Sequence, residues 1–187
     1  MIEQIIEDFS KAFQFKAVSL RYFNAAGAHP TSDIGEMHDP ETHLIPLTLQ
    51  AASGRRPNIR IFGSNYNTFD GTCIRDYIHV NDLCNAHFLA MNFLKKQKQG
   101  FFEAFNLGNG EGFSVKQVIN CAQKIVAKDG KDIAVMAEGP REGDPSILVA
   151  DSKKAKQNLG WTPKYFELET IIQHAWNWEK KLTEKPS

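Results

Sequence analysis

Residues 17–30 constrain the fold of this chain more than any other stretch. They read AVSLRYFNAAGAHP, an apolar segment that runs into a series of small residues. This pattern predicts a buried strand followed by a loop. Open α/β sheets bind their ligands in the crevice beyond the carboxyl ends of such strands. A nucleotide site of that kind normally shows a glycine-rich strand-to-helix turn earlier in the chain, but only one amphipathic segment, residues 1–14, precedes this strand.

Strand-like and helix-like segments alternate along the rest of the sequence. Apolar residues at helical spacing predict helices, at residues 1–14, 44–53, 81–95, 115–126 and 168–181. Short apolar runs predict strands, at residues 17–23, 59–62, 74–79, 102–107, 133–136 and 147–149. The alternation indicates the α/β class.

Polar residues ahead of three of these segments are candidate helix caps. Thr42 can cap the helix that stops at Gly54. Ser114 with Gln117 three residues later forms a capping-box pattern. Asp151 or Ser152 can cap a short helix that ends at the sequence NLGW.

Charge and cysteine usage restrict the functional class. Lys and Arg number 22, as do Asp and Glu, so we expect neither a nucleic acid nor a membrane surface as partner. No apolar run is long enough to span a bilayer, and no signal-peptide pattern is visible. Three cysteines without CxxC spacing favour a reduced, cytoplasmic compartment.

Two short motifs carry charged groups suited to binding. In GTCIRDYIHV, Arg75 can offer its planar fork to phosphate oxygens, and the alternative is a structural Arg75–Asp76 pair that pins a loop. In GPREGDP, Arg141 suits a diphosphate and Asp144 suits ribose hydroxyls, and the alternative is a solvated turn. Spacing alone favours the structural alternative in both motifs.

Other suggestive residues predict no chemistry. The glycines of NLGNGEG lack the GxGxxG order, so a plain strand-to-helix turn is the better interpretation. His38 and His43, with Asp39 and Glu41 between them, match no recurrent ligand spacing, so we expect no metal site. No nucleophile stands in a motif with its base.

Five ordered segments carry a family resemblance, namely SLRYFNAAGAHP, the stretch from HLIPLTLQ to RDYIHVNDL, FNLGNGEGFSVKQVI, REGDP and LGWTPKY. Through them the chain resembles the UDP-glucose 4-epimerases of the extended short-chain dehydrogenase/reductase superfamily. The resemblance implies the C-terminal part of a Rossmann-type NAD-binding fold plus a smaller mixed α/β sugar-nucleotide-binding domain. Residues 1–27, 76–95 and 102–125 would belong with the incomplete Rossmann sheet, and residues 28–75 and 126–187 mainly with the other domain.

The family's activity is implied by the same resemblance. Its members interconvert UDP-glucose and UDP-galactose, a step of galactose metabolism, by NAD-dependent transient oxidation at sugar C4. The resemblance thus implies NAD as cofactor, with Tyr22 and Phe23 lining its nicotinamide end. It also implies a homodimer in the full-length enzyme.

The resemblance assigns substrate contacts residue by residue. Asn24 would touch the sugar nucleotide, and His43 and Leu44 would lie along the diphosphate and sugar. Uracil would be held mainly by backbone groups and packing, at Arg60, Ile61 and Phe62. Phosphates would be clamped by Arg75 and Arg141 and the uridine ribose by Asp144. Leu148 falls where the family sets the size of the sugar pocket.

The chain departs from the family in the catalytic part. It contains no glycine-rich dinucleotide loop and no Tyr-x-x-x-Lys motif, so we expect no catalytic residue in this chain and no activity from it alone. Residues 1–13 resemble the second half of the helix that carries this motif. The helix expected at residues 1–14 has an apolar face that predicts self-association. The face consists of Ile2, Ile5, Ile6, Phe9 and Phe13.

Two alternative functions stay open at this point. One is another NAD-dependent enzyme that modifies UDP-sugars, such as a decarboxylase, dehydratase or reductase. The other is a sugar-nucleotide-binding module without catalysis.

Overall fold

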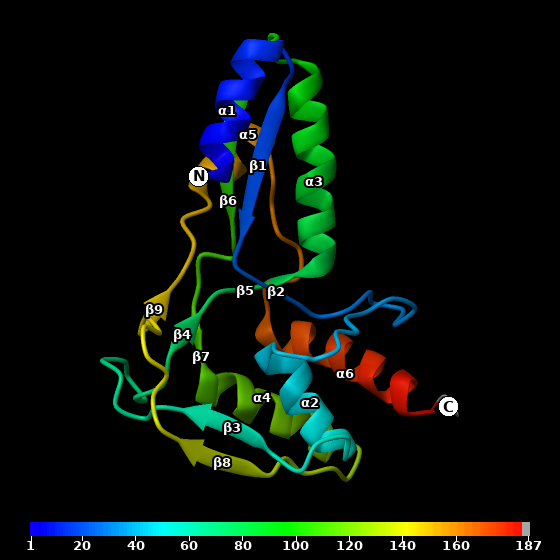
Figure 1. The fold of residues 1–187 in the computed structure, drawn as a ribbon. Helices are drawn as coiled ribbons and strands as arrows, with labels where there is room; N and C mark the ends of the chain where they lie inside the picture. Colours follow the sequence, from blue (N-terminus) through cyan, green and yellow to red (C-terminus); the bar gives the residue numbers. More distant parts are fainter. Residues whose placement is uncertain (185–187) are drawn as a thin grey trace.

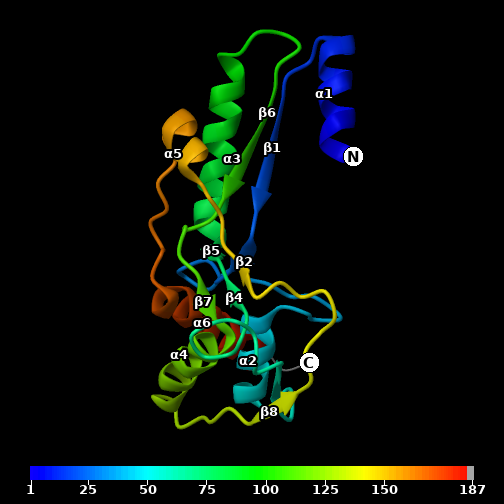
Figure 2. The same cartoon turned by 90° about the vertical axis from the view of Figure 1, so that its left-hand side faces the viewer.

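The computed structural model describes residues 1–184, in which two lobes stand end to end (Figure 1). One lobe is built around the strands β1 (Ala17–Tyr22) and β6 (Phe102–Leu107), which pair in parallel. The helix α1 (Ile2–Phe13) covers one face of this pair, while α3 (Val80–Lys95) and α5 (Lys153–Leu159) cover the other (Figure 2). The α/β class expected from the alternating pattern is thus confirmed.

The first lobe has its own apolar core between the strand pair, α3 and α5. Its buried members come from three separate stretches of sequence: Ile78, Leu83, Ala86, Ala90, Phe105, Leu107, Ala155, Leu159 and Trp161. The carboxylate of Asp82 accepts the backbone amides of Lys164 and Tyr165, and the Trp161 indole donates to the Asp82 carbonyl at 3.0 Å. These bonds attach the segment after α5 to the start of α3.

The second lobe contains three helices and several short strands. The helices α2 (Leu44–Ser53), α4 (Val115–Ala127) and α6 (Leu168–Glu184) contact one another around a core that includes Leu49, Ile125 and Trp176. Two small sheets complete the lobe. In one, β3 (Ile59–Phe62) pairs in parallel with β8 (Val135–Glu138). In the other, β4 (Ile74–Arg75) lies between antiparallel β7 (Phe113–Ser114) and parallel β9 (Ile147–Leu148).

Asp76 separates two strands where the sequence predicts one. The expected strand over residues 74–79 is divided into β4 and β5 (Tyr77–His79), and β5 pairs with β2 (Asn24–Ala26) between the lobes. The Asp76 carboxylate is fully buried and accepts backbone amides from Asn109, Gly110 and Ala150 at 2.9–3.1 Å. Asp76 therefore bonds to the turn after β6 and the segment after β9, and not to Arg75.

The helix caps follow the sequence predictions in one case and depart from them in another. The Ser114–Gln117 capping box at the start of α4 is confirmed. The prediction that Thr42 caps α2 is wrong, because the cap position is His43. The amides of Thr42 and His43 donate instead to the Glu41 carboxylate at 2.7 and 2.9 Å. Glu41 thus fixes the chain just before α2 and does not cap the helix itself.

The two cores divide the chain differently from the expected residue ranges at two helices. Residues 115–125 were expected with the Rossmann sheet, yet α4 packs on α2 and α6 in the second lobe. Residues 153–161 were expected in the other domain, yet α5 and Trp161 pack in the first lobe. An apolar helix face predicts burial but does not indicate which core buries it. Within residues 1–184, no helix is both long and apolar enough to cross a membrane.

Candidate functional site

A cleft of about 510 Å³ lies beneath the β2–β5 pair, in the second lobe. Its walls are β2, the start of α2, β3, the β4–β5 segment and the chain between β8 and β9. Eight of the residues proposed to bind substrate line it: Asn24, His43, Leu44, Arg60, Phe62, Arg75, Arg141 and Asp144. These residues lie far apart in the sequence, and the fold brings them around one cavity.

Four other proposed residues lie outside this lining. Tyr22 is 49% exposed at the end of β1, and Phe23 follows it. Successive side chains of a strand point to opposite faces. Arg60 and Phe62 therefore line the cleft, and Ile61 between them packs on the core of the second lobe. Leu148 stands on β9 in register with Arg75 and is 45% exposed.

The cleft is electrically positive. Its lining residues include four arginines, Arg56, Arg60, Arg75 and Arg141, against the single carboxylate of Asp144. A concave site lined by one sign of charge concentrates ligands of the opposite sign. Arginine forks match phosphate oxygens in a bidentate manner. This wall is suited to a phosphorylated ligand.

Arg75 is the most enclosed of the paired charges in the cleft. Its side chain is 14% exposed and donates through Nη2 to Asp144 Oδ1 at 2.5 Å, while Nη1 donates to the Ile74 carbonyl at 2.8 Å. The Cys73 thiol lies 3.8 Å from the other oxygen of Asp144. The structural alternative of an Arg75–Asp76 pair is therefore wrong, since each of these two residues has a different partner.

Arg141 and Arg60 are held by looser contacts on the opposite wall. The guanidinium carbon of Arg141 lies 3.9 Å from the centroid of the Phe62 ring, a cation–π arrangement. Arg60 lies 3.5 Å from Glu138 across the β3–β8 pair, and both side chains are largely exposed. Arg141 and Arg60 have more freedom than Arg75 to turn toward a ligand.

The end of β2 and the start of α2 form the remaining wall. The side-chain amide of Asn24 donates to the Asp76 carbonyl at 2.9 Å, which fixes Asn24 beside β5. The helix α2 begins at Leu44 on the edge of the cleft. A helix N-terminus carries partial positive charge and favours anions, which adds to the effect of the arginines.

Sequence reasoning missed several lining residues, among them Arg56, Asn58 and Tyr77. Arg56 and Asn58 lie in the turn between α2 and β3, where nothing in the sequence separates a site residue from a solvated loop. Tyr77 lies within the motif that was singled out, on a strand. Burial raises the pKa of Tyr77 well above its usual range, so its hydroxyl stays protonated and is unsuited to act as a base.

The glycine turn after β6 does not bind phosphate through its amides. The amides of Asn109 and Gly110 already donate to Asp76. A Cβ at Gly108 would lie 2.5 Å from an Asp76 oxygen, so glycine allows this close approach. Burial raises the pKa of Asp76, and the three amides that it accepts act in the opposite direction. The interpretation of NLGNGEG as a plain turn is confirmed.

Comparison with known proteins decides the family. The model of the NAD dependent epimerase/dehydratase family matches residues 1–108, which is more than half of the chain. The chain belongs to this family. A UDP-glucose 4-epimerase of Halalkalibacterium halodurans is 52% identical over 180 residues, which are 96% of this chain and 52% of the relative. The chain thus spans about half the length of the curated relatives that it matches.

Solved structures of the epimerase/dehydratase family share this fold. One crystal structure of a UDP-glucose 4-epimerase covers the whole chain at 48% identity with a TM-score of 0.91, and the match takes in 55% of that structure. Another, from Stenotrophomonas maltophila, has bound NAD and formylated UDP-arabinopyranose. It is 34% identical with a TM-score of 0.89, over 97% of this chain and 53% of that one. The resemblance to UDP-glucose 4-epimerases and the Rossmann-type fold are confirmed.

Proposed function

We propose that this chain forms the substrate-binding half of a UDP-glucose 4-epimerase. One observation carries the proposal: four arginines and a helix N-terminus surround a single cleft in a chain whose relatives are UDP-glucose 4-epimerases. The diphosphate lies between Arg75 and Arg141, and the uridine ribose bonds to Asp144. Uracil packs on β3 beside Phe62, and the hexose lies toward Asn24 and the start of α2.

Ligand binding exchanges one partner of Arg75 for another. In the structure Arg75 donates to Asp144. The diphosphate takes this donor, and the Asp144 carboxylate becomes available to accept hydrogen bonds from ribose hydroxyls. Each of these bonds involves a charged group in a partly enclosed site, where such bonds contribute on the order of 1.5–3 kcal/mol.

NAD is the cofactor of the proposed reaction, and when bound it accepts hydride from sugar C4 and returns it to the other face. This chain contributes the residues at the carboxyl end of β1, in the first lobe, to the cofactor site. Tyr22 stands exposed where β1 ends, followed by Phe23, and this placement supports a contact with the nicotinamide end. The described residues offer no glycine-rich turn for the pyrophosphate, because the amides after β6 are already bonded to Asp76.

Catalysis needs groups that these 187 residues do not contain. In the family the 4-hydroxyl proton goes to the tyrosine of Tyr-x-x-x-Lys. None of Tyr22, Tyr66, Tyr77 and Tyr165 has a lysine four residues later. We expect the chain alone to bind UDP-sugars in the cleft without epimerising them.

Leu148 governs the choice of sugar in this proposal. Its side chain is shorter than a tyrosine that closes the pocket and larger than the small residues that admit N-acetyl groups. We expect UDP-glucose and UDP-galactose to be converted much faster than their N-acetylated counterparts. Comparable catalytic efficiency on both pairs would exclude this role of Leu148.

A chimera tests the function directly. It joins the part of the Halalkalibacterium halodurans relative that this chain does not span to the 187 residues described. With UDP-galactose, the chimera is expected to produce UDP-glucose, and the chain alone is expected to match a protein-free blank. Titration calorimetry of the chain with UDP gives the second readout. A folded chain that binds UDP no better than inorganic phosphate contradicts the proposal.

A further inference from the structure

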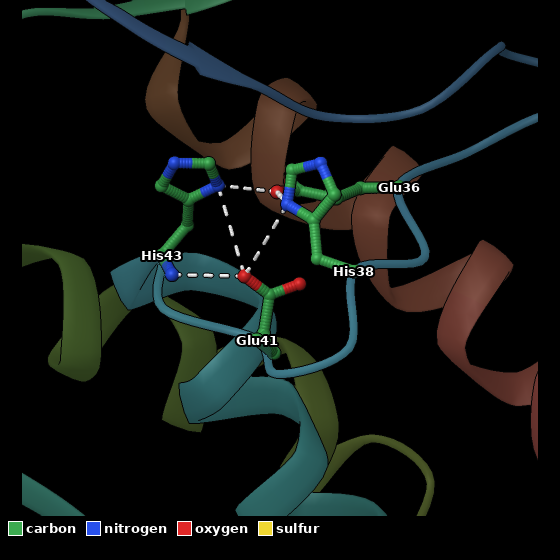
Figure 3. A group of neighbouring side chains, drawn as sticks. All are labelled: Glu36, His38, Glu41 and His43. Carbon is green, nitrogen blue, oxygen red and sulfur yellow. Dashed lines mark hydrogen bonds and ion pairs between the residues drawn. The ribbon is translucent and has the colours of Figure 1, made fainter.

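Two histidines and two glutamates converge beside the start of α2 (Figure 3), and one of them, His43, also lines the cleft. Each of Glu36, His38, Glu41 and His43 offers one ligand atom, and the four atoms lie within 4.8 Å of one another. Nδ1 of His38 lies 2.9 Å from Glu36 Oε1, and Nδ1 of His43 bonds to the same oxygen. Glu41 Oε1 lies 3.9 Å from His38 Nδ1 and 3.7 Å from His43 Nδ1.

The loop that carries this cluster is positioned by the last helix. The Trp178 indole of α6 donates to the Glu36 carbonyl at 2.8 Å. A Cβ at Gly35 would collide with the Trp178 ring, so only glycine lets the loop approach α6 this closely. Glu41 is held by the amides of Thr42 and His43. The loop backbone at Glu36 and the carboxylate of Glu41 are therefore positioned by backbone and indole contacts, which partly preorganises the site.

The two carboxylates lack an ordinary counter-charge. The side chains of Glu41 and Glu36 are only 5% and 17% exposed. Within residues 1–184, no lysine or arginine lies within 4.0 Å of either carboxylate, and the two imidazoles are their only ion-pair partners. Buried charges require compensation. A divalent cation held between the two carboxylates supplies both charges at once.

We propose that these four side chains bind a zinc ion. Zinc accepts imidazole nitrogen and carboxylate oxygen in a tetrahedron, with bonds of about 2.0–2.2 Å that place ligand atoms roughly 3.3 Å apart. The four ligand atoms lie within 4.8 Å of one another, so rotations of the side chains complete the geometry. Two carboxylates and two neutral imidazoles balance the ion's charge.

This zinc site differs from what the sequence pattern indicates. The expectation of no metal considered Asp39 and Glu41, the acids between the two histidines. In the structure Asp39 lies outside the cluster. The fourth ligand is Glu36, which precedes His38 in the sequence. His43 also lines the cleft, so the ion would lie at the edge of the cleft and join the loop over residues 28–42 to the start of α2.

Zinc binding to the purified, untagged chain tests the proposal. The Cys84→Ser background removes the one exposed thiol, a competing ligand. Titration calorimetry at pH 7.5 is expected to give one equivalent of bound Zn²⁺, and Mg²⁺ is expected to give none because imidazole is a poor ligand for it. Co²⁺ in place of zinc is expected to show the visible absorption of four-coordinate cobalt without a thiolate band.

Two variants and one control complete the test. Glu36→Gln and His38→Asn each remove one ligand and are expected to weaken Zn²⁺ binding at least about 100-fold. His87→Asn removes an exposed histidine on α3 and is expected to leave binding unchanged. Circular dichroism verifies that each variant is folded. Absence of Zn²⁺ binding to the parent chain, or equal affinity in His38→Asn and His87→Asn, overturns the proposal.

Discussion

Arg75 and Asp144 bond directly to each other, although 68 residues separate them in the chain. Arg75 belongs to β4, and Asp144 precedes β9, the strand that pairs with β4 in parallel. The β4–β9 pairing therefore brings the cation and the carboxylate together at one edge of the cleft. In the proposed function, a nucleotide bound at this edge takes the Arg75 donor from Asp144.

Removal of the Arg75 guanidinium is expected to weaken UDP binding. Arg75→Ala deletes a charge-assisted donor in an enclosed site, and the affinity for UDP should fall about tenfold or more. Titration calorimetry measures it. Lys98→Ala, at an exposed position outside the cleft, serves as the control because it removes a positive charge that has no ion-pair partner within residues 1–184. Similar losses in both variants would show that Arg75 does not contact the diphosphate.

Arg55 is unsuitable as that control, although it stands just after α2. Its guanidinium donates to both carboxylate oxygens of Glu179 at 3.0 and 3.2 Å, and the Glu179 side chain is 6% exposed. Arg55→Ala leaves this carboxylate without its cation, so the variant changes stability as well as charge.

Acidification is expected to destabilise the fold through His79. This side chain is fully buried between the lobes, and burial lowers its pKa to about 4, with a further contribution from His174. Its Nδ1 accepts the Asn81 amide, so Nε2 carries the proton and donates to His174 Nδ1 at 2.9 Å. Protonation of Nδ1 would break the bond that begins α3.

The direction of this pH dependence follows from the protons that the folded and unfolded states bind. The unfolded His79 has a pKa of about 6.5, above the folded value, so the unfolded state binds more protons as pH falls from about 6.5 to about 4. The contribution of His79 to the free energy of unfolding is fully present above this window. It decreases as the pH falls through the window, with a slope of up to about 1.4 kcal/mol per pH unit. Denaturant unfolding at several pH values measures it. A slope as steep in His79→Gln as in the parent chain would contradict the assignment, and His87→Gln is the control.

Asp76→Asn is expected to destabilise the chain although the two side chains have the same size. Asparagine offers one acceptor oxygen and an amide nitrogen, whereas the buried carboxylate accepts three backbone amides. An amide left without an acceptor in the interior costs about 1–3 kcal/mol. Urea unfolding of this variant should show a lower midpoint, and Asp132→Asn at an exposed site should not. Equal midpoints would mean that water satisfies these amides.

The apolar face of α1 is expected to drive self-association. Ile2, Ile5, Phe9 and Phe13 are 49–71% exposed, and the rings of Phe9 and Phe13 lie 5.2 Å apart. Phe9→Glu places a charge in the middle of this face and should weaken association at least about tenfold. Sedimentation velocity over a range of concentrations measures it, with Phe69→Glu, at another exposed aromatic, as control. A parent chain that stays monomeric at all concentrations would disprove the prediction.

Local patterns predicted the elements better than their assembly. Apolar spacing located α3 and α6, and the Ser114–Gln117 pattern located the start of α4, because these signals depend on residues within one or two turns. The break at Asp76 was not predictable, since it depends on amides 33, 34 and 74 residues away. The packing of α4 in the second lobe depends on α2 and α6 in the same way.

The site was predictable only where a motif carried it. Arg75, Arg141 and Asp144 were noticed within short distinctive segments and assigned through the family resemblance, and all three line the cleft. Arg56 lies in an ordinary turn and gave no signal. Glu36 precedes the two histidines, so inspection of the residues between them could not find it.

The parallel pairing of β1 with β6 has a kinetic consequence. Ala17 lies opposite Phe102, so the strands of the first lobe meet only after 84 intervening residues have been arranged. Chains dominated by such distant pairings fold more slowly than helical bundles of similar stability, because loop-closure entropy is lost before the contacts form. The second lobe also depends on distant pairing, since Ile59 of β3 lies opposite Val135 of β8 with 75 residues between them. Neither lobe can close early in folding, and the apolar faces of β1 and β6 are expected to stay exposed until these two strands pair.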